Sequence, residues 1–130
     1  MRVYLAGPPS ADDYRRRAEA LLRDAGFEPV DPFRRDFRGR TKGHEAEIVE
    51  GDLEDIRSCD AVLADFSVPD EGTAMEAWYA HGLGKHVVAY TGGRDPHPWT
   101  VYVAGAVCTE LAAAVRALEA GEEIDEGRTP

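Results

Sequence analysis

The chain has 130 residues, a length that suits one domain with a single buried core; 43% of the residues are apolar and 31% charged, as in soluble globular proteins. No apolar run approaches the roughly 18 residues that a membrane span needs, so we expect no membrane insertion. The net charge of −10 argues against binding to nucleic acid polymers or anionic membranes, which repel an acidic protein. The N-terminus carries no signal-peptide pattern, so we expect a cytoplasmic protein.

The first element is a predicted strand at residues 2–7 (RVYLAG), which a Gly-Pro-Pro sequence stops. A helix should follow, capped by Ser10 or Asp12 and ended by Gly26. A second short strand is expected at 27–31. The apolar residues of the helix recur at helical spacing: Tyr14, Ala18, Leu21, Leu22 and Ala25.

A basic loop follows the second strand. Residues 1–43 carry a net charge of +3 and residues 44–130 a net charge of −13, and the basic side chains concentrate in RRDFRGRTK (34–42). This stretch has no apolar period, so it is either a solvated loop or a lid that meets an anion.

The second half of the chain alternates between predicted helices and apolar strands. The expected elements are a helix at 43–57 with Ile48, Val49, Leu53 and Ile56 as its buried stripe, a strand at 59–67, a helix at 72–83, a strand at 85–91, a long turn at 92–99, a short strand at 105–108 and a helix at 110–119. Residues 1–120 are thus expected to form one domain, and the acidic end, 121–130, to be a frayed tail.

Repeated alternation of strand and helix predicts an α/β fold: an open doubly wound, flavodoxin-like parallel sheet of about five strands with helices on both faces. Ligands of such sheets bind at the C-terminal ends of the strands, where strand order reverses. The loop after the first strand and the loop after strand 59–67 should therefore border one crevice. The substrate-binding candidates in these loops are Gly7, Pro8, Ser67, Asp70 and Gly72.

Glu76 is the main candidate for a chemical role, and it has two interpretations. Thr73 and Glu76 fit the capping-box spacing, in which each side chain satisfies a backbone donor at a helix start. Alternatively, the helix dipole favours the ionised carboxylate, which at the mouth of a crevice can act as a nucleophile. Other acids near the same crevice favour the second interpretation, because a cluster of carboxylates is costly to assemble without a use.

The neighbours of Glu76 also have structural interpretations. Asp52 lies inside a predicted helix, where exposed acids are common. Asp70 can simply cap helix 72–83. Tyr4, on a buried strand, is typical of a core aromatic residue, but its place near the end of the strand makes a polar role possible.

No metal or cofactor is expected. The histidines are scattered, and no Cys/His cluster has the spacing of a zinc site. The two cysteines, Cys59 and Cys108, are more typical of buried thiols than of a disulfide in a chain without an export signal.

Three segments together carry a family resemblance: YLAGP near the start, DLEDIRSCDAVLADFS in the middle and DEGTAMEAWYAHGLGKHVVAY after it. They resemble the nucleoside 2-deoxyribosyltransferases and their relatives, the 2'-deoxynucleoside 5'-monophosphate N-glycosidases, over roughly residues 2–90. The resemblance implies that Glu76 is the nucleophile that attacks C1' of the sugar. It implies that Asp52 contacts the ring and protonates the departing base, that Tyr4 orients Glu76, and that Asp70 holds sugar hydroxyls.

The resemblance leaves the substrate open between nucleosides and their 5'-monophosphates. The monophosphate glycosidases tend to have Ser where this chain has Asp70, and an aspartate would repel a phosphate dianion. The arginines of the loop favour a phosphate instead. We expect a small-molecule nucleoside or nucleotide as the partner, with nucleosides favoured. A non-catalytic nucleotide-binding domain and an enzyme acting on another N-glycoside, such as a nicotinamide dinucleotide, are the other possibilities.

The resemblance also implies a homodimer or larger homo-oligomer with shared active sites. The segment HPWTVYVAG (97–105) is the expected source of a residue given to the neighbouring subunit. Trp78 departs from the family, which usually has a small residue there, and it can face either the base pocket or the core.

Overall fold

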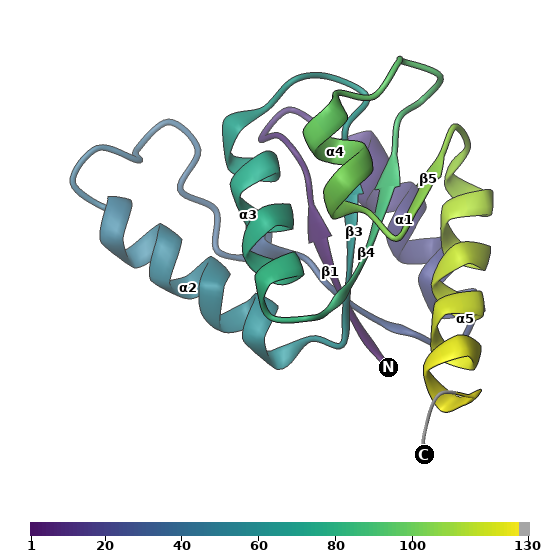
Figure 1. The fold of residues 1–130 in the computed structure, drawn as a ribbon. Coiled ribbons are helices and arrows are strands. Elements are labelled where there is room, and N and C mark those ends of the chain that lie inside the picture. The colour runs from purple at the N-terminus through teal and green to yellow at the C-terminus, as the bar shows by residue number, and fades with distance from the viewer. Residues whose placement is uncertain (128–130) are drawn as a thin grey trace.

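The fold is an open five-stranded parallel sheet with helices on both faces (Figure 1), seen in a computed structural model that describes residues 1–127. Its elements in chain order are β1 (Arg2–Ala6), α1 (Asp12–Asp24), β2 (Glu28–Val30), the 3-10 helix η1 (Pro32–Arg34), α2 (Glu45–Ser58), β3 (Ala61–Asp65), α3 (Glu71–Gly82), β4 (His86–Tyr90), α4 (Pro98–Val103), β5 (Ala106–Cys108) and α5 (Leu111–Gly127). The predicted fold class is confirmed.

The strand order is β2-β1-β3-β4-β5, and every neighbouring pair is parallel. This is the order of flavodoxin-like folds, in which the direction of winding reverses between β1 and β3. All of β3 is buried, as expected of a parallel strand that is covered on both sides. The switch point therefore lies where β1 and β3 end, beside the loops that begin at Gly7 and Phe66.

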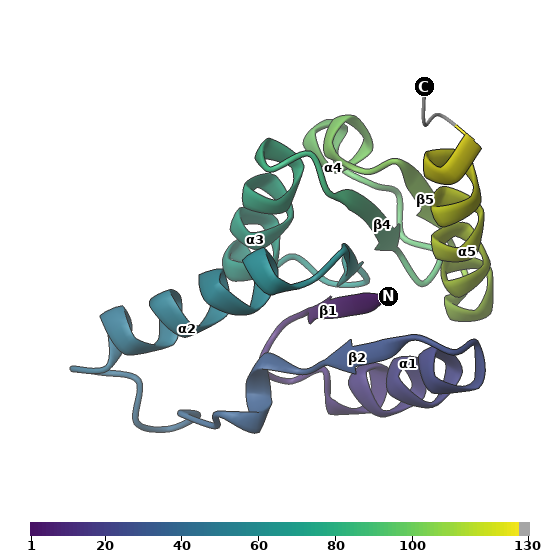
Figure 2. The same ribbon diagram turned by 90° about the horizontal axis from the view of Figure 1, so that it is seen from below.

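Two apolar clusters hold the helices to the sheet, one on each face. The cluster under α1 and α5 includes Val3 and Leu5 of β1, and the cluster under α2 and α3 includes Tyr4 and Ala6. Because alternate residues of a strand point to opposite faces, Tyr4 faces the side that α2 and α3 cover. In Figure 2 the sheet separates α1 and α5 from α2, α3 and α4.

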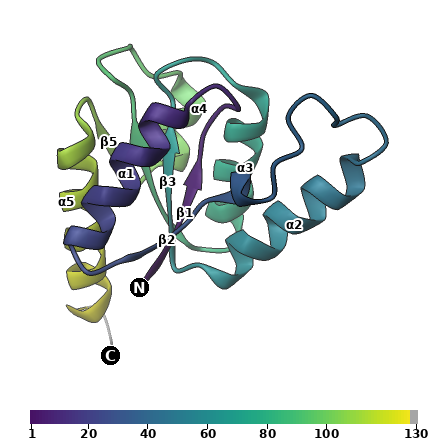
Figure 3. The same ribbon diagram turned by 180° about the vertical axis from the view of Figure 1, so that it is seen from behind.

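Helix α2 lies less deeply than we predicted. Of its expected apolar stripe only Ile56 is fully buried, while Ile48 and Leu53 are half-buried and Val49 is 52% exposed. The start of α2 and the loop before it project away from the sheet (Figure 3), so they have no partner layer on the outer side. The stripe is therefore available to line a cleft.

Three other local expectations differ from the structure. Neither Ser10 nor Asp12 caps α1, because Ala11 occupies the cap position and no side chain bonds there. Part of the expected turn at 92–99 and the residues after it form α4, which His97 caps through Nδ1. Helix α5 continues past residue 119 to Gly127, and residues 128–130 of the tail that we expected to fray lie outside the described residues.

Candidate active site

A cleft of about 340 Å³ opens beside the switch point of the sheet, between the β1–α1 loop, the basic loop, α2 and the start of α3. Its walls contain three carboxylates, two arginines and several apolar side chains. The lining residues are Gly7, Pro9, Pro32, Phe33, Arg35, Phe37, Arg38, Thr41, Ile48, Val49, Asp52, Leu53, Asp70, Gly72, Met75 and Glu76. An apolar cleft with a few convergent acids is the usual form of a small-molecule site.

Glu76 lies in the second turn of α3, and its side chain meets Tyr4 of β1. The Tyr4 hydroxyl donates a hydrogen bond to Oε2 of Glu76. Tyr4 is fully buried and is not among the residues that line the cleft, so it acts on the site through its bond to Glu76. Burial, together with the neighbouring charges of Glu76 and Asp52, raises the pKa of Tyr4 well above its ordinary value, so it acts as a donor.

The carboxyl of Glu76 is not the helix cap that the Thr73–Glu76 spacing allowed. It takes part in no capping bond, because the cap position belongs to another residue, Asp70. The pKa of Glu76 is raised to about 8: burial is the largest cause, the Tyr4 bond opposes it, and the charges of Asp52 and Asp70 act in the same direction as burial. Loss of solvation thus acts against the ionised form that the helix dipole is expected to favour.

Asp52 lies on α2 and lines the same cleft, half-buried rather than on the open surface. Burial raises its pKa to about 6, although Arg35 acts in the opposite direction. Arg35 Nη2 lies 3.3 Å from Asp52 Oδ1. Asp52 and Glu76 are therefore two acids in one cleft that titrate in different ranges, as in enzymes that use one carboxyl as base and another as acid.

Asp70 is the N-cap of α3. Its Oδ2 accepts bonds from the Thr73 backbone nitrogen at 3.0 Å and from Thr73 Oγ1 at 2.7 Å. Asp70 therefore caps the helix, as one of its two interpretations held, and it also lines the cleft. The cap bonds engage Oδ2, and a substrate hydroxyl can bond the same carboxylate through Oδ1.

The four remaining candidates divide into two pairs. Gly7 and Gly72 line the cleft, and a Cβ on Gly7 would lie 3.1 Å from the Tyr14 ring, so a side chain there would crowd that ring. Pro8 and Ser67 do not line it. The Pro8 carbonyl accepts from Arg15 Nη1 at 2.8 Å, and the Ser67 nitrogen donates to Asp65 Oδ1 at 2.9 Å, so both serve the loops.

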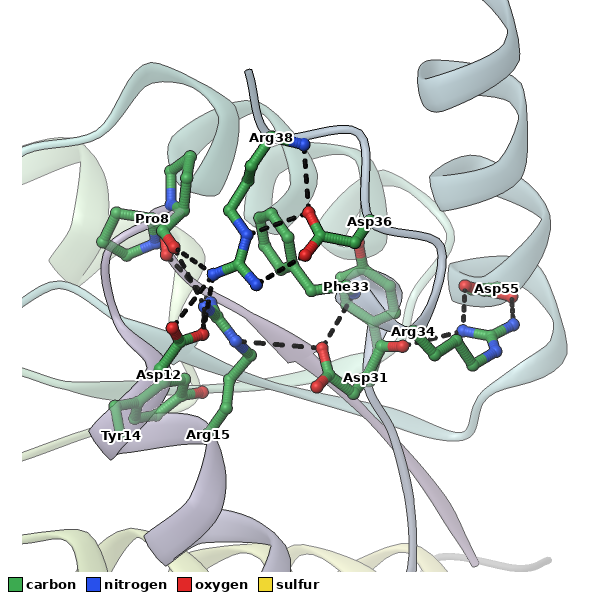
Figure 4. A network of polar contacts seen from close by, with 12 residues as sticks. Pro8, Asp12, Tyr14, Arg15, Asp31, Phe33, Arg34, Asp36, Arg38 and Asp55 are labelled. Carbon is green, nitrogen blue, oxygen red and sulfur yellow. Dashed lines mark hydrogen bonds and ion pairs between the residues drawn. The ribbon is translucent and has the colours of Figure 1, made fainter. Parts of the chain in front are cut away.

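The basic loop is a network of ion pairs (Figure 4). Arg34 binds Asp55 through both terminal nitrogens, at 2.7 and 2.8 Å. Arg38 binds Asp36 at 2.7 Å and Asp12 at 2.8 Å, which joins the loop to the start of α1. Because acids neutralise these cations, the loop as it stands does not offer a strongly positive lid.

Two aromatic residues that the sequence analysis missed belong to the cleft: one lies in η1, just before the basic loop, and the other lies within the loop. Phe33 and Phe37 both line the cleft. The guanidinium of Arg15 lies 4.2 Å from the centre of the Phe33 ring, and that of Arg38 lies 5.3 Å away (Figure 4), contacts that hold the ring in place. The sequence did contain a signal for them, because two phenylalanines stand four residues apart in an otherwise polar, basic stretch.

A second, larger cavity of about 660 Å³ lies between α3 and α4. Trp78 and Trp99 line it, and both are largely exposed, at 50% and 66%. Their rings meet edge to face at 5.6 Å, and His81 joins Trp78 to Tyr102. We call Trp78, His81, Trp99 and Tyr102 the aromatic face. Trp78 therefore lies at the surface and lines this cavity, rather than facing the core.

The described residues contain no helix with the length and apolarity needed to span a membrane. Within the same residues, no group of three or more His, Cys, Asp or Glu is placed to hold a metal ion. Cys59 and Cys108 are free thiols, the first buried and the second half-buried.

Comparison with known proteins places the chain in a family. Its sequence matches the model of the nucleoside 2-deoxyribosyltransferase family over residues 3–125. A 2-deoxyribosyltransferase from Bacillus psychrosaccharolyticus has a similar structure, with a TM-score of 0.74 and 22% identity over 88% of this chain and 90% of that one. A CMP N-glycosidase from Clostridium botulinum superposes with a TM-score of 0.63 and 17% identity over 92% of this chain and 99% of its own.

A conserved protein from Enterococcus faecalis V583 has a TM-score of 0.70 and 18% identity, over 92% of this chain and 97% of that one. None of the curated proteins matches the sequence. At these identities the structural neighbours establish the fold alone, whereas the family model covers almost the whole chain. The chain belongs to the nucleoside 2-deoxyribosyltransferase family.

Proposed function

We propose that this protein cleaves the N-glycosidic bond of 2'-deoxyribonucleosides and transfers the deoxyribosyl group to another base, or to water, through a covalent intermediate on Glu76. The observation that carries the proposal is the cleft in which the Tyr4 hydroxyl bonds Glu76 and a second acid, Asp52, lines the wall. Family membership supports the reaction class. The specific roles of the residues are our inference.

The reaction runs in two displacements. The Glu76 carboxylate attacks C1' of the sugar, the C1'–N bond breaks with its electron pair going to the base, and Asp52 supplies a proton to that base. A nitrogen of a second base, or water, then attacks C1' from the opposite side, the C1'–O bond to Glu76 breaks with its electron pair returning to the carboxylate, and Asp52 takes the proton that the attacking group loses. Two inversions give net retention, as in retaining glycosidases, and the carboxylate stabilises the cation-like sugar at both transition states.

The proton balance of the two acids fits this scheme. With pKa values of about 6 for Asp52 and about 8 for Glu76, the pair holds one proton near neutral pH. In the substrate-free cleft that proton resides mainly on Glu76. For the reaction, Glu76 must be ionised and Asp52 must carry the proton. The pair holds one proton in both arrangements, so substrate binding has to move that proton from Glu76 to Asp52 without taking one from solvent.

The charges of the cleft favour a neutral nucleoside over a monophosphate. Both cleft arginines are already paired: Arg35 with Asp52 and Asp55, and Arg38 with Asp12 and Asp36. A phosphate would have to displace carboxylates from them and would also meet the charge of Asp70. Asp70 suits a neutral 5'-hydroxyl, which can donate a hydrogen bond to it.

We further infer that the protein acts as a homodimer or larger homo-oligomer in which the aromatic face meets another copy. Trp99 and Tyr102 are 66% and 72% exposed, which is unusual for large aromatic side chains on a monomer. Asp70 lines both the catalytic cleft and the cavity under this face, so a segment seated in that cavity would reach the active site. This supports a site shared between subunits.

A chromatographic assay tests the proposed function. Purified protein is incubated with a panel of deoxynucleosides and their 5'-monophosphates, with and without a second base. We expect a new nucleoside when the second base is present and slower release of free base without it. Release from monophosphates alone would establish the alternative hydrolase, release of nicotinamide from a dinucleotide would establish the third reaction, and ligand binding without any base release would establish a non-catalytic domain.

A further inference from the structure

Gly51 and Arg35 form a contact that the reaction scheme does not use. A Cβ built on Gly51 would lie 2.9 Å from Nε, 3.1 Å from Cζ and 3.1 Å from Nη2 of Arg35. The guanidinium therefore lies against the backbone of α2 at the one position of this turn that has no side chain. Glycine costs stability inside a helix, so its place in α2 calls for a packing reason.

The guanidinium that rests on Gly51 joins two acids of the same helix. Nη2 of Arg35 lies 2.7 Å from Asp55 Oδ2 and 3.3 Å from Asp52 Oδ1. Asp55 is itself held by Arg34, and although burial would raise its pKa, these hydrogen bonds keep the pKa of Asp55 low. Asp55 is therefore an anionic anchor that fixes Arg35 beside Asp52.

We propose that Arg35 is a positioning residue for Asp52, holding its carboxyl group at the cleft wall through their direct ion pair, and that Gly51 is what admits the guanidinium. This inference rests on the proposed function in one respect, namely that Asp52 gives its proton to the departing base. The contact itself is independent of substrate. Arg35 is a residue of the basic loop, so the loop acts on the general acid rather than on a phosphate.

The other groups around Asp52 explain why Arg35 is needed. Burial is the largest cause that disfavours the charged form of Asp52 and raises its pKa, and the charge of Asp55 acts in the same direction. The titratable or charged groups that face Asp52 or share its cleft are Arg34, Arg35 and Arg38 of the basic loop, Asp55 of α2, Asp70 and Glu76 of the α3 region, and Tyr4 of β1. Among them only Arg35 makes a direct ion pair with Asp52 within the described residues.

The test is a titration of the substrate-free protein by carbon NMR, with the aspartate carboxyls labelled and the signal of Asp52 assigned from Asp52→Asn. In Arg35→Gln we expect the titration midpoint of Asp52 to rise by about one pH unit or more, as when a carboxylate loses an arginine partner. Arg35→Lys should restore part of the shift. Arg40→Gln is the control, because Arg40 belongs to the same loop and bonds the Asp36 carbonyl instead.

Gly51→Ala tests the second half of the proposal without removing a charge. The new methyl group should displace the flexible guanidinium, so the Asp52 midpoint should again rise, while alanine itself favours the helix. If Gly51 had no role in admitting the guanidinium, Gly51→Ala should leave the titration midpoint of Asp52 unchanged and raise the melting temperature. That pattern in Gly51→Ala, or an unchanged midpoint in folded Arg35→Gln, would overturn the inference.

The same variants separate this inference from the proposed function. In an active enzyme the lower-pH limb of kcat/KM for base release should move upward with the NMR midpoint, and Arg35→Gln should have no further effect on that limb in an Asp52→Asn background. If the unmodified protein releases no base, the proposed function fails, yet the titration still decides whether Arg35 controls Asp52.

Discussion

The hydroxyl of Tyr4, on the first strand, donates a hydrogen bond to Glu76, on the third helix, and so joins two residues 72 positions apart at the switch point of the sheet. The ring of Tyr4 is locked in the apolar cluster beneath α2 and α3, so the direction of its hydroxyl is set by the sheet. The carboxyl that we propose as the nucleophile, on a helix, is thereby held by a group on a strand. This arrangement restricts the carboxylate before substrate arrives.

Glu76→Gln should remove most turnover while preserving the fold. The amide keeps the size of the side chain and can still accept from Tyr4, but it cannot form the glycosyl ester. We expect base release to fall by roughly a thousandfold or more, as for other nucleophile replacements. Single-turnover chromatography of released base measures the effect, with circular dichroism as the check on folding. A rate within a few-fold of the unmodified enzyme would exclude a covalent role.

The same substitution should change how stability depends on pH. The pKa of Glu76 rises from an ordinary 4.5 to about 8, so between these values the native state binds the proton more tightly than the unfolded state. The free energy of unfolding that Glu76 contributes is therefore complete below the lower value and is lost as pH rises to the upper one, by up to about 1.4 kcal/mol per pH unit.

Urea denaturation at pH 5.5 and 7.5 checks this expectation. The advantage of Glu76→Gln over the unmodified protein should grow between the two pH values, whereas Glu50→Gln, an exposed acid on α2, should show no such growth. An equal difference at both pH values would mean that Glu76 is ionised in the native state throughout.

Tyr4→Phe should slow the reaction and move its pH profile. For the unmodified enzyme we expect a bell-shaped profile of kcat/KM with limbs at about 6 and about 8, which belong to the pair of acids. The Tyr4 bond lowers the pKa of Glu76, so its loss should move the upper limb to higher pH. A bond to a charged group contributes about 1.5–3 kcal/mol, which corresponds to roughly 10- to 100-fold in rate. A slower enzyme with unmoved limbs would indicate a packing role alone.

Asp70→Ser should shift the preference from nucleosides toward 5'-monophosphates. Serine caps helices about as well as aspartate, so α3 should keep its start while the cleft loses a negative charge. We expect the ratio of kcat/KM for monophosphate over nucleoside to rise by on the order of tenfold or more. Asp70→Asn, which removes the charge and keeps the shape, is the matched control for the charge effect. An unchanged ratio in both variants would show that Asp70 does not face the 5' position.

Trp99→Glu should weaken self-association and lower activity together. A carboxylate at the centre of an apolar contact would have to lose its hydration when two copies meet. Sedimentation velocity should show the unmodified protein as a dimer or larger and the variant shifted toward the 14.2 kDa monomer. Val107→Glu, at an exposed apolar position on β5 outside the aromatic face, is the control. A monomeric and fully active unmodified protein would contradict a shared site.

The order of the elements could be read from the sequence because its signals are local. Continuous apolar runs identified β1, β3 and β4, and the Gly-Pro-Pro sequence marked the loop that borders the cleft. Glu76 could be singled out because other acids were expected near the same crevice, but its spacing from Thr73 equally fitted a capping box. The burial of α2 was harder to predict. Its apolar stripe is typical of a buried helix face, but the structure leaves Val49 exposed at the cleft.

The tertiary structure decided which partner each polar group takes. Either Asp70 or Thr73 could cap α3 by residue type, and Asp70 does so by bonding Thr73 itself. The arginines of the basic loop suggested a phosphate site, yet Arg34, Arg35 and Arg38 pair with acids of α1, α2 and their own loop. Sequence determines the periodicity that builds strands and helices, whereas hydrogen bonds and ion pairs between distant residues depend on which groups the fold brings within about 3 Å of each other.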